Sequence, residues 1–131
     1  MTDKFTVIEG EQYTVVESQV DKLDSLNAPD IKSELVFLIK SGKKNIIVDL
    51  EKTRYVDSSG LSALLTGNRL CKDNKGSFVI CCLQPSVEKL VHISQLSSVF
   101  EITPTRNEAI DVVMMNEIER ELEDEKQKKD Q

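Results

Sequence analysis

The sequence predicts a single α/β domain in which an opening β-hairpin precedes strands and helices that alternate. A length of 131 residues fits one domain with a sizeable apolar core. Short runs of β-branched and aromatic residues indicate strands, and the segments between them carry apolar residues at helical spacing. Because alternating strands and helices need crossover connections, we expect a mixed, mainly parallel sheet with helices packed on it.

The amino-terminal third predicts the hairpin and the first helix. Two runs at 5–9 and 13–16 flank a short turn and favour paired strands. The segment 27–30 is typical of a helix start, because proline and an early aspartate suit the first turn. The apolar face of this helix consists of Ile31, Leu35, Leu38 and Ile39.

The rest of the chain continues the alternation. Further strands are expected at 46–48, 78–83 and 99–102. Further helices are expected to begin at 57–60, 85–86 and 105–108, the last of these segments having the pattern of a capping box. The apolar positions of the final helix, which we expect to face the sheet, are Ile110, Val113, Met114, Ile118 and Leu122.

The composition shifts near the carboxyl end. We place the domain in residues 1–116 and a charged helical extension with a tail in residues 117–131. The extension holds seven acidic and four basic side chains, and no apolar residue follows Leu122. Ordering the backbone costs about 1–2 kcal/mol per residue. We therefore expect packing to end near Leu122 and the remainder to fray in solvent.

Charge and hydropathy exclude several classes of protein. The net charge of −6 opposes direct binding to nucleic acid or to anionic membranes, which attract clustered Lys and Arg. No apolar run approaches the roughly 18 residues of a membrane span, so membrane insertion is not expected. No apolar signal segment follows the first four residues. A cytoplasmic protein, present as a monomer or a weak dimer, is the expectation.

Cysteine usage predicts reduced, buried thiols. Cys71, Cys81 and Cys82 form no CxxC pair, and an odd count is a poor disulfide framework. Adjacent strand residues point to opposite faces, so the thiols of Cys81 and Cys82 should diverge. With His92 as the single histidine, no transition-metal site is expected. No cofactor is expected either, because the phosphate-cradling glycine motifs are absent.

The segment 49–61 is the best candidate for a functional site. It runs from the carboxyl end of a central strand into a helix start, where open parallel sheets meet ligands and partners. Asp57, Ser58 and Ser59 fit a plain helix cap. They also fit a phosphorylation switch, because a helix amino terminus favours negative charge. Gly60 should leave the serines accessible.

Three segments resemble the STAS family, the domain of anti-sigma factor antagonists and of sulfate-transporter tails. They are 46–50, 55–61 with its Asp-Ser-Ser-Gly-Leu motif, and 85–90. The resemblance extends from about Phe5 to about Val113 and implies a small sheet covered by helices. Short chains of this type are usually bacterial antagonists, which bind other proteins and are not enzymes.

The resemblance implies a mechanism and a set of site residues. In such antagonists the serine after the motif aspartate, here Ser58, is phosphorylated by an anti-sigma factor that is also a serine kinase. Ser59 is the alternative position. The unphosphorylated form binds the anti-sigma factor and frees sigma, and a serine phosphatase reverses the modification. The implied partner-binding residues are Asp24, Asp57, Ser58, Ser59, Gly60, Leu61 and Ser62.

The sequence departs from the family pattern at two of these places. The family's Gly-Glu-Leu-Asp turn is matched by 21–24 only in part, with Asp24 retained and the glycine lost. Ser62 stands where the family often has glycine, and it enlarges the surface beside Ser58. Neither departure removes the serine that would be phosphorylated.

Two other functions remain open at this stage. One is a STAS accessory subunit of a membrane transport complex, which would dock without being phosphorylated. The other is a small nucleotide-binding or nucleotide-hydrolysing protein, for which the sequence supplies no phosphate loop, metal pair or general base. The Asp57–Ser58 pair favours the phosphorylated antagonist, because a scaffold requires no hydroxyl there.

Overall fold

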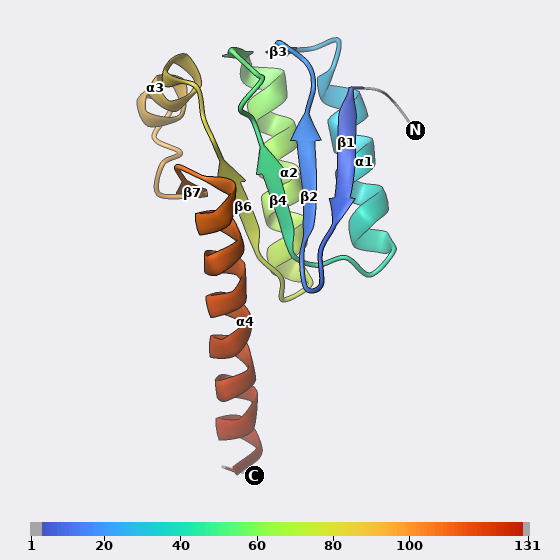
Figure 1. The fold of residues 1–131 in the computed structure, drawn as a ribbon, viewed down its shortest axis with the longest axis vertical. Helices are drawn as coiled ribbons and strands as arrows, with labels where there is room; N and C mark the ends of the chain where they lie inside the picture. Colours follow the sequence, from blue (N-terminus) through green and yellow to red (C-terminus); the bar gives the residue numbers. More distant parts are fainter. Residues whose placement is uncertain (1–3, 130–131) are drawn as a thin grey trace.

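The computed structural model describes residues 4–129, which form two sheets and four helices (Figure 1). The larger sheet has the order β1-β2-β4-β6-β7, and β3 pairs with β5 separately. The strands are β1 (Phe5–Glu9), β2 (Thr14–Ser18), β3 (Lys22–Leu23), β4 (Ile46–Asp49), β5 (Tyr55–Val56), β6 (Phe78–Cys81) and β7 (Glu101–Thr103). The helices are α1 (Ala28–Lys40), α2 (Ser58–Asp73), α3 (Pro85–Ile93) and α4 (Arg106–Lys129).

Strand pairing confirms the predicted fold class. β1 and β2 form the antiparallel hairpin, with Phe5 opposite Ser18 and Glu9 opposite Thr14. Every other pair in the larger sheet is parallel, so the sheet is mixed and mainly parallel as expected. The strands β3 and β5 were not predicted, because two residues are too few for a periodic signal.

The central strands β4 and β6 of the larger sheet are covered on both faces, which explains their continuous apolar runs. Val16, Val48 and Ile80 pack into the larger core on the face covered by α1 and α2. Their neighbours Val15, Ile47 and Val79 point the other way and pack with Ala109 and Val113 of α4. Fully burying one such side chain contributes about 1.5–3 kcal/mol. Because side chains alternate along each strand, the same strands supply apolar residues to the cores on both faces of the sheet.

The first turn of α4 is held to the sheet by charge. Glu17 and Asp49 are register partners on β2 and β4, and the Arg106 guanidinium donates to both carboxylates. Its Nη2 atom lies 2.7 Å from Oδ2 of Asp49. The hydrogen bond from Arg106 keeps the pKa of Glu17 below its ordinary value. Burial opposes the charge on Arg106, but the bonds to Asp49 and Glu17 raise its pKa.

Only the first half of α4 lies on the sheet. Val113 is buried and Ile110 half-buried, as predicted. The inward packing predicted for Met114, Ile118 and Leu122 is wrong, because these side chains are 37%, 51% and 61% exposed. The prediction that packing continues to about Leu122 is therefore also wrong, and the segment beyond it, which was expected to fray, is helical to Lys129.

The edge of the sheet explains these errors. Arg120 Nη2 donates to the carbonyl of Gly76 at 2.8 Å, just before β6 begins, and Glu117 accepts from Asn45, just before β4. Within residues 4–129, no strand lies under α4 beyond these contacts, and the helix projects from the body of the molecule (Figure 1). Residues 123–129, which belong to the predicted tail, are exposed.

One further prediction from sequence is wrong. Cys71 and Cys81 are buried free thiols, as expected. Cys82, however, lies beyond the end of β6 with a positive φ of 62°. This left-handed conformation removes the strand alternation, and Cys82 packs against the same apolar cluster as Cys81. The two thiols therefore lie on the same face of the sheet instead of diverging.

The ion pair between Glu17 and Arg106 predicts a pH-dependent stability. The pKa of Glu17 in the folded protein lies below its ordinary value of 4.5. The ion pair therefore makes its full contribution to the free energy of unfolding above pH 4.5, and this contribution is lost as pH falls through the folded pKa. We expect Glu17→Gln to lower the free energy of unfolding at pH 7 by up to about 1 kcal/mol. The difference from wild type should shrink in acid, as measured by urea denaturation across pH. A difference that is constant with pH would contradict this, and Glu11→Gln on the hairpin loop is the control.

The exposed end of α4 predicts tolerance to truncation. Side chains 123–129 bury no apolar surface, so their helix rests on pairs that each contribute about 0.2–0.5 kcal/mol. Deleting residues 124–131 should leave the melting temperature within a few degrees of wild type. A larger fall would mean that this segment packs on the domain.

Candidate functional site

The predicted helix cap is present at the start of α2. Asp57 has an extended backbone, and its Oδ1 atom accepts a hydrogen bond from the Gly60 amide at 3.0 Å. This bond satisfies one of the amides that the first helical turn leaves free. Ser58 is the first residue of the helix, and its side chain is exposed. Its hydroxyl therefore lies at the positive end of the helix dipole, open to solvent.

The small β3–β5 sheet joins the other predicted site residue to this helix start. Leu23 is the register partner of Val56, and the Asp57 amide donates to the Leu23 carbonyl at 3.2 Å. Asp24 follows directly. Its Oδ1 atom accepts from the amides of Leu26 and Asn27, and so shapes the turn into α1. The segments carrying Asp24 and Ser58 are thus fixed side by side.

The buried glycine of the motif has a steric role that sequence analysis missed. A Cβ atom on Gly60 would lie 2.3 Å from the carbonyl oxygen of Leu23 and 2.9 Å from a methyl of Val56. Gly60 is buried, so its missing side chain lets α2 approach β3 and does not act by uncovering the serines. Leu61 is only 8% exposed and belongs to the core. Both residues lie below the surface that a partner would touch.

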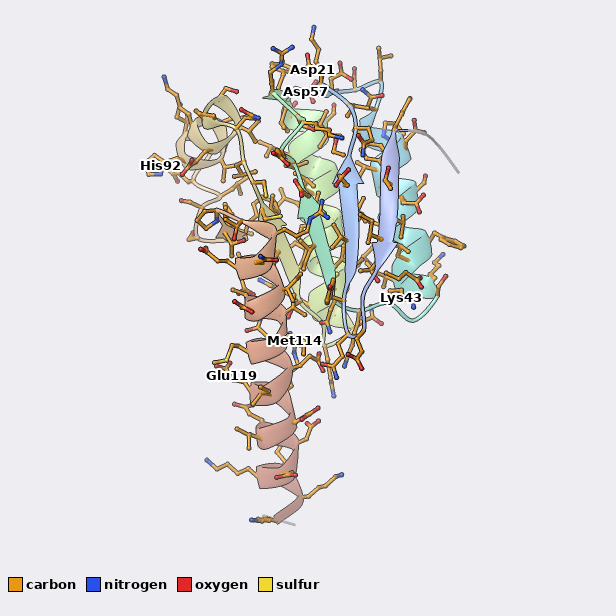
Figure 2. All side chains as sticks on the ribbon, in the orientation of Figure 1. Asp21, Lys43, Asp57, His92, Met114 and Glu119 are labelled. Carbon is orange, nitrogen blue, oxygen red and sulfur yellow. The ribbon has the colours of Figure 1, made fainter. Side chains whose placement is uncertain are left out.

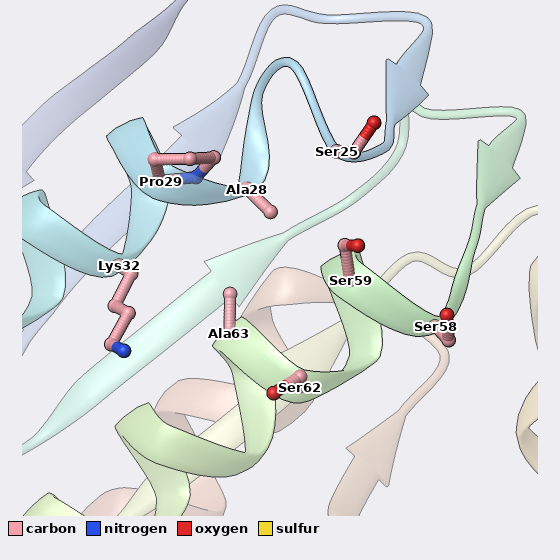
Figure 3. Close-up of a pocket in the computed structure, with 8 residues that line it drawn as sticks. All are labelled: Ser25, Ala28, Pro29, Lys32, Ser58, Ser59, Ser62 and Ala63. Carbon is pink, nitrogen blue, oxygen red and sulfur yellow. The ribbon is translucent and has the colours of Figure 1, made fainter.

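A pocket of about 450 Å³ lies between the starts of α1 and α2 (Figure 3). It is lined by Ser25, Ala28, Pro29, Lys32, Ser58, Ser59, Ser62 and Ala63. The pocket therefore joins three predicted residues, Ser58, Ser59 and Ser62, to the first turns of α1. Ser59 is half-buried in it, whereas Ser62 is exposed one turn further along α2.

Lys32 is a charged residue of this pocket that sequence analysis did not identify. It extends from α1 toward α2, opposite the serines (Figure 3). Its spacing from Pro29 places both residues on one side of α1, but this spacing alone does not indicate that α2 lies opposite. Lys32 brings a positive charge to a pocket otherwise lined by hydroxyls and small apolar groups.

Exposed apolar side chains border the same end of the molecule. Leu26, in the turn before α1, is 80% exposed, and Tyr55, on β5, is 52% exposed. Asp21 and Asp57 lie at this end too (Figure 2). The hydrogen bond from Arg54 keeps the pKa of Asp21 below its ordinary value. Apolar groups surrounded by fixed charges are typical of protein-binding surfaces.

Comparison with known families identifies the class of protein. The STAS domain family matches residues 8–109, and the chain belongs to this family. A candidate anti-sigma factor antagonist of Bordetella bronchiseptica, BtrV, is 29% identical over 87 residues, which cover 66% of this chain and 75% of BtrV. None of the helices between residues 4 and 129 combines the length and apolar character that a membrane crossing requires.

Solved structures share the fold at low sequence identity. A candidate anti-sigma factor antagonist of Thermotoga maritima superposes with a TM-score of 0.78 at 20% identity, covering 84% of this chain and 94% of that one. The anti-sigma factor antagonist SpoIIAA of Bacillus, in its unphosphorylated form, gives 0.66 at 22% identity, with coverages of 84% and 97%. These similarities confirm the STAS fold.

The contact at Gly60 predicts a stability effect that runs against helix propensity. Alanine is favoured over glycine in helices by about 1 kcal/mol. The backbone oxygen of Leu23 cannot rotate away, and overpacking costs about 1–3 kcal/mol. Gly60→Ala should therefore lower the free energy of unfolding measured in urea, whereas the exposed Ser62→Ala should change it by less than about 0.5 kcal/mol. Stability equal to wild type in Gly60→Ala would contradict this packing.

Proposed function

We propose that this STAS protein is an anti-sigma factor antagonist-like regulator, switched by reversible phosphorylation of Ser58. The observation that carries the proposal is the exposed Ser58 hydroxyl, which directly follows the Asp57 cap at the start of α2. This position corresponds to the serine that is modified in antagonists of this type. In this proposal the protein acts by binding a partner and has no catalytic activity of its own.

A phosphate on Ser58 suits the fold and changes the surface. It adds roughly −1.5 to −2 charges, which the helix amino terminus favours. The side chain is exposed, so no core packing is disturbed. The new charge would lie beside Asp57 and across the pocket from Lys32. The domain therefore stays folded while its partner surface becomes more negative.

The neighbouring serines are less suitable as substrates. Ser59 is half-buried in the pocket, which limits the approach of a kinase. Ser62 is exposed but lies within the helix, where its amide is already used and the dipole is weaker. Exposure and position at the helix start together favour Ser58.

The proposed partner is an anti-sigma factor that is also the serine kinase, and a serine phosphatase reverses the modification. The unphosphorylated surface would combine Asp24, Asp57, Ser58, Ser59 and Ser62, while Gly60 and Leu61 hold these residues in place. A partner that covers Ser58 closely must desolvate or pair any phosphate there, which weakens binding. The names of BtrV and SpoIIAA support this partner class, and SpoIIAA has also been solved in a phosphorylated form.

A docking subunit of a membrane transport complex is the alternative. A sulfate transporter family protein of Wolinella succinogenes shares the fold at 12% identity, with a TM-score of 0.71 and coverages of 83% and 90%. At this identity the similarity concerns the fold alone. A docking subunit would bind its partner equally well whatever the charge at residue 58.

Charge at Ser58 should control partner binding. A partner captured from native extract by the wild-type protein should bind Ser58→Asp at least about tenfold more weakly, or about 1.4 kcal/mol, by calorimetry. Ser58→Ala should bind and resist modification. Ser98→Asp adds the same charge at an exposed serine between α3 and β7 and should bind like wild type.

Phosphopeptide mapping separates the switch from its alternatives. After incubation with extract and ATP, phosphate should be found on Ser58. Modification confined to Ser59 or Ser62 would place the switch elsewhere. Equal affinity of wild type, Ser58→Asp and Ser58→Ala would favour the docking subunit.

A further inference from the structure

A row of polar side chains crosses the larger sheet at the carboxyl ends of its strands. Glu17, Asp49, Cys81 and Thr103 are successive register partners on β2, β4, β6 and β7. Asp49 is 2% exposed and Cys81 is fully buried. This row lies on the face covered by α4, away from the pocket that contains Ser58.

The turn after β6 adds a second thiol to this row. With its φ of 62°, Cys82 returns its side chain to the face on which Cys81 lies. The two sulfur atoms and a carboxylate oxygen of Asp49 all lie within 4.8 Å of one another. Two thiols and a carboxylate thus lie close together, although they come from two strands and a turn.

We propose that Cys81, Cys82 and Asp49 form a binding site for a thiophilic divalent metal ion of the Zn²⁺ class. Thiolates select soft or borderline ions, and two sulfurs with one oxygen suit tetrahedral Zn²⁺ with a fourth position for water. Zn–S bonds of about 2.3 Å place tetrahedral sulfurs roughly 3.8 Å apart. The two sulfur atoms, which lie within 4.8 Å of each other, are close to that spacing.

The surroundings of Asp49 orient it for this role. Its Oδ2 atom accepts from Arg106, and its Oδ1 atom accepts from the Glu51 amide at 2.9 Å. Oδ2 accepts from both Nε and Nη2 of Arg106, whereas Oδ1 accepts a single bond and keeps a lone pair for a metal, so these bonds can persist when a metal is bound. Such partners fix the direction of a ligating carboxylate. Arg106 is itself neutralised by Glu17, which limits its repulsion of an incoming cation.

The proton balance of metal uptake follows from the state of the thiols. A free thiol has an ordinary pKa of about 8.5, so both thiols carry protons at neutral pH before metal binds. Forming two metal–sulfur bonds releases these two protons, while Asp49 binds as the carboxylate. Cys82 is only half-buried and gives the ion a path from solvent.

Spectroscopic titration tests the site directly. Reduced full-length protein is titrated with Co²⁺ and with Cd²⁺, which report thiolate bonds by charge-transfer absorption. We expect one equivalent to bind, with the visible bands of tetrahedral Co²⁺ and with proton release that can be measured in weak buffer. Zn²⁺ should displace Co²⁺ and raise the melting temperature, and a chelator should reverse both effects.

Variants distinguish this site from adventitious thiol binding. Cys82→Ser should abolish the charge-transfer band, and Asp49→Asn should weaken binding at least tenfold. Cys71→Ala removes the cysteine of α2, on the other face of the sheet, and should bind like wild type. Absence of a band in the wild type, or a band that survives Cys82→Ser, would overturn the proposal. Because Cys82 is half-buried, its variant should fold, and near-ultraviolet circular dichroism checks this.

Discussion

The candidate partner site depends on one close backbone approach, that of Gly60 to the carbonyl oxygen of Leu23. Any side chain at residue 60 would fill the space in which α2 meets β3. The same carbonyl accepts the Asp57 amide, so one peptide group fixes both the cap and the turn beside it. Asp24 and Ser58 come from segments 34 residues apart, and this contact holds them at one surface. The motif glycine thus allows α2 to pack closely against β3, and the motif serine remains exposed at the surface.

A second constraint acts on the face of the larger sheet that α4 covers, where ion pairs hold the helix to the strands. Arg106 joins the first turn of α4 to carboxylates on β2 and β4. Asp49 is almost fully buried, so losing Arg106 would leave a carboxylate without its counter-charge. The same arrangement directs Asp49 toward the two thiols at the end of β6. The carboxyl edge of the sheet therefore carries two separate candidate sites, one on each face.

Sequence patterns predicted those parts of the fold that carry several periods of an apolar repeat. The hairpin, the central strands and α1 were predictable because burial imposes the period directly. Periodicity shows which residues share a helix face, but not how far the sheet extends beneath, so Ile118 and Leu122 were misplaced. The Asp57 cap and the exposure of Ser58 followed from local preference. Lys32 and the turn at Cys82 did not, because both depend on contacts between distant segments.

The distance over which charge acts decides how a phosphorylated form of this protein would be recognised. The chain already carries a net charge of −6, so one phosphate changes its total charge only modestly. At physiological ionic strength, exposed charges are screened beyond about 8 Å. A partner that senses the total charge would barely distinguish the two forms. Discrimination therefore requires contact with the surface around Ser58, where a closely packed partner would exclude water and where Lys32 lines the same pocket.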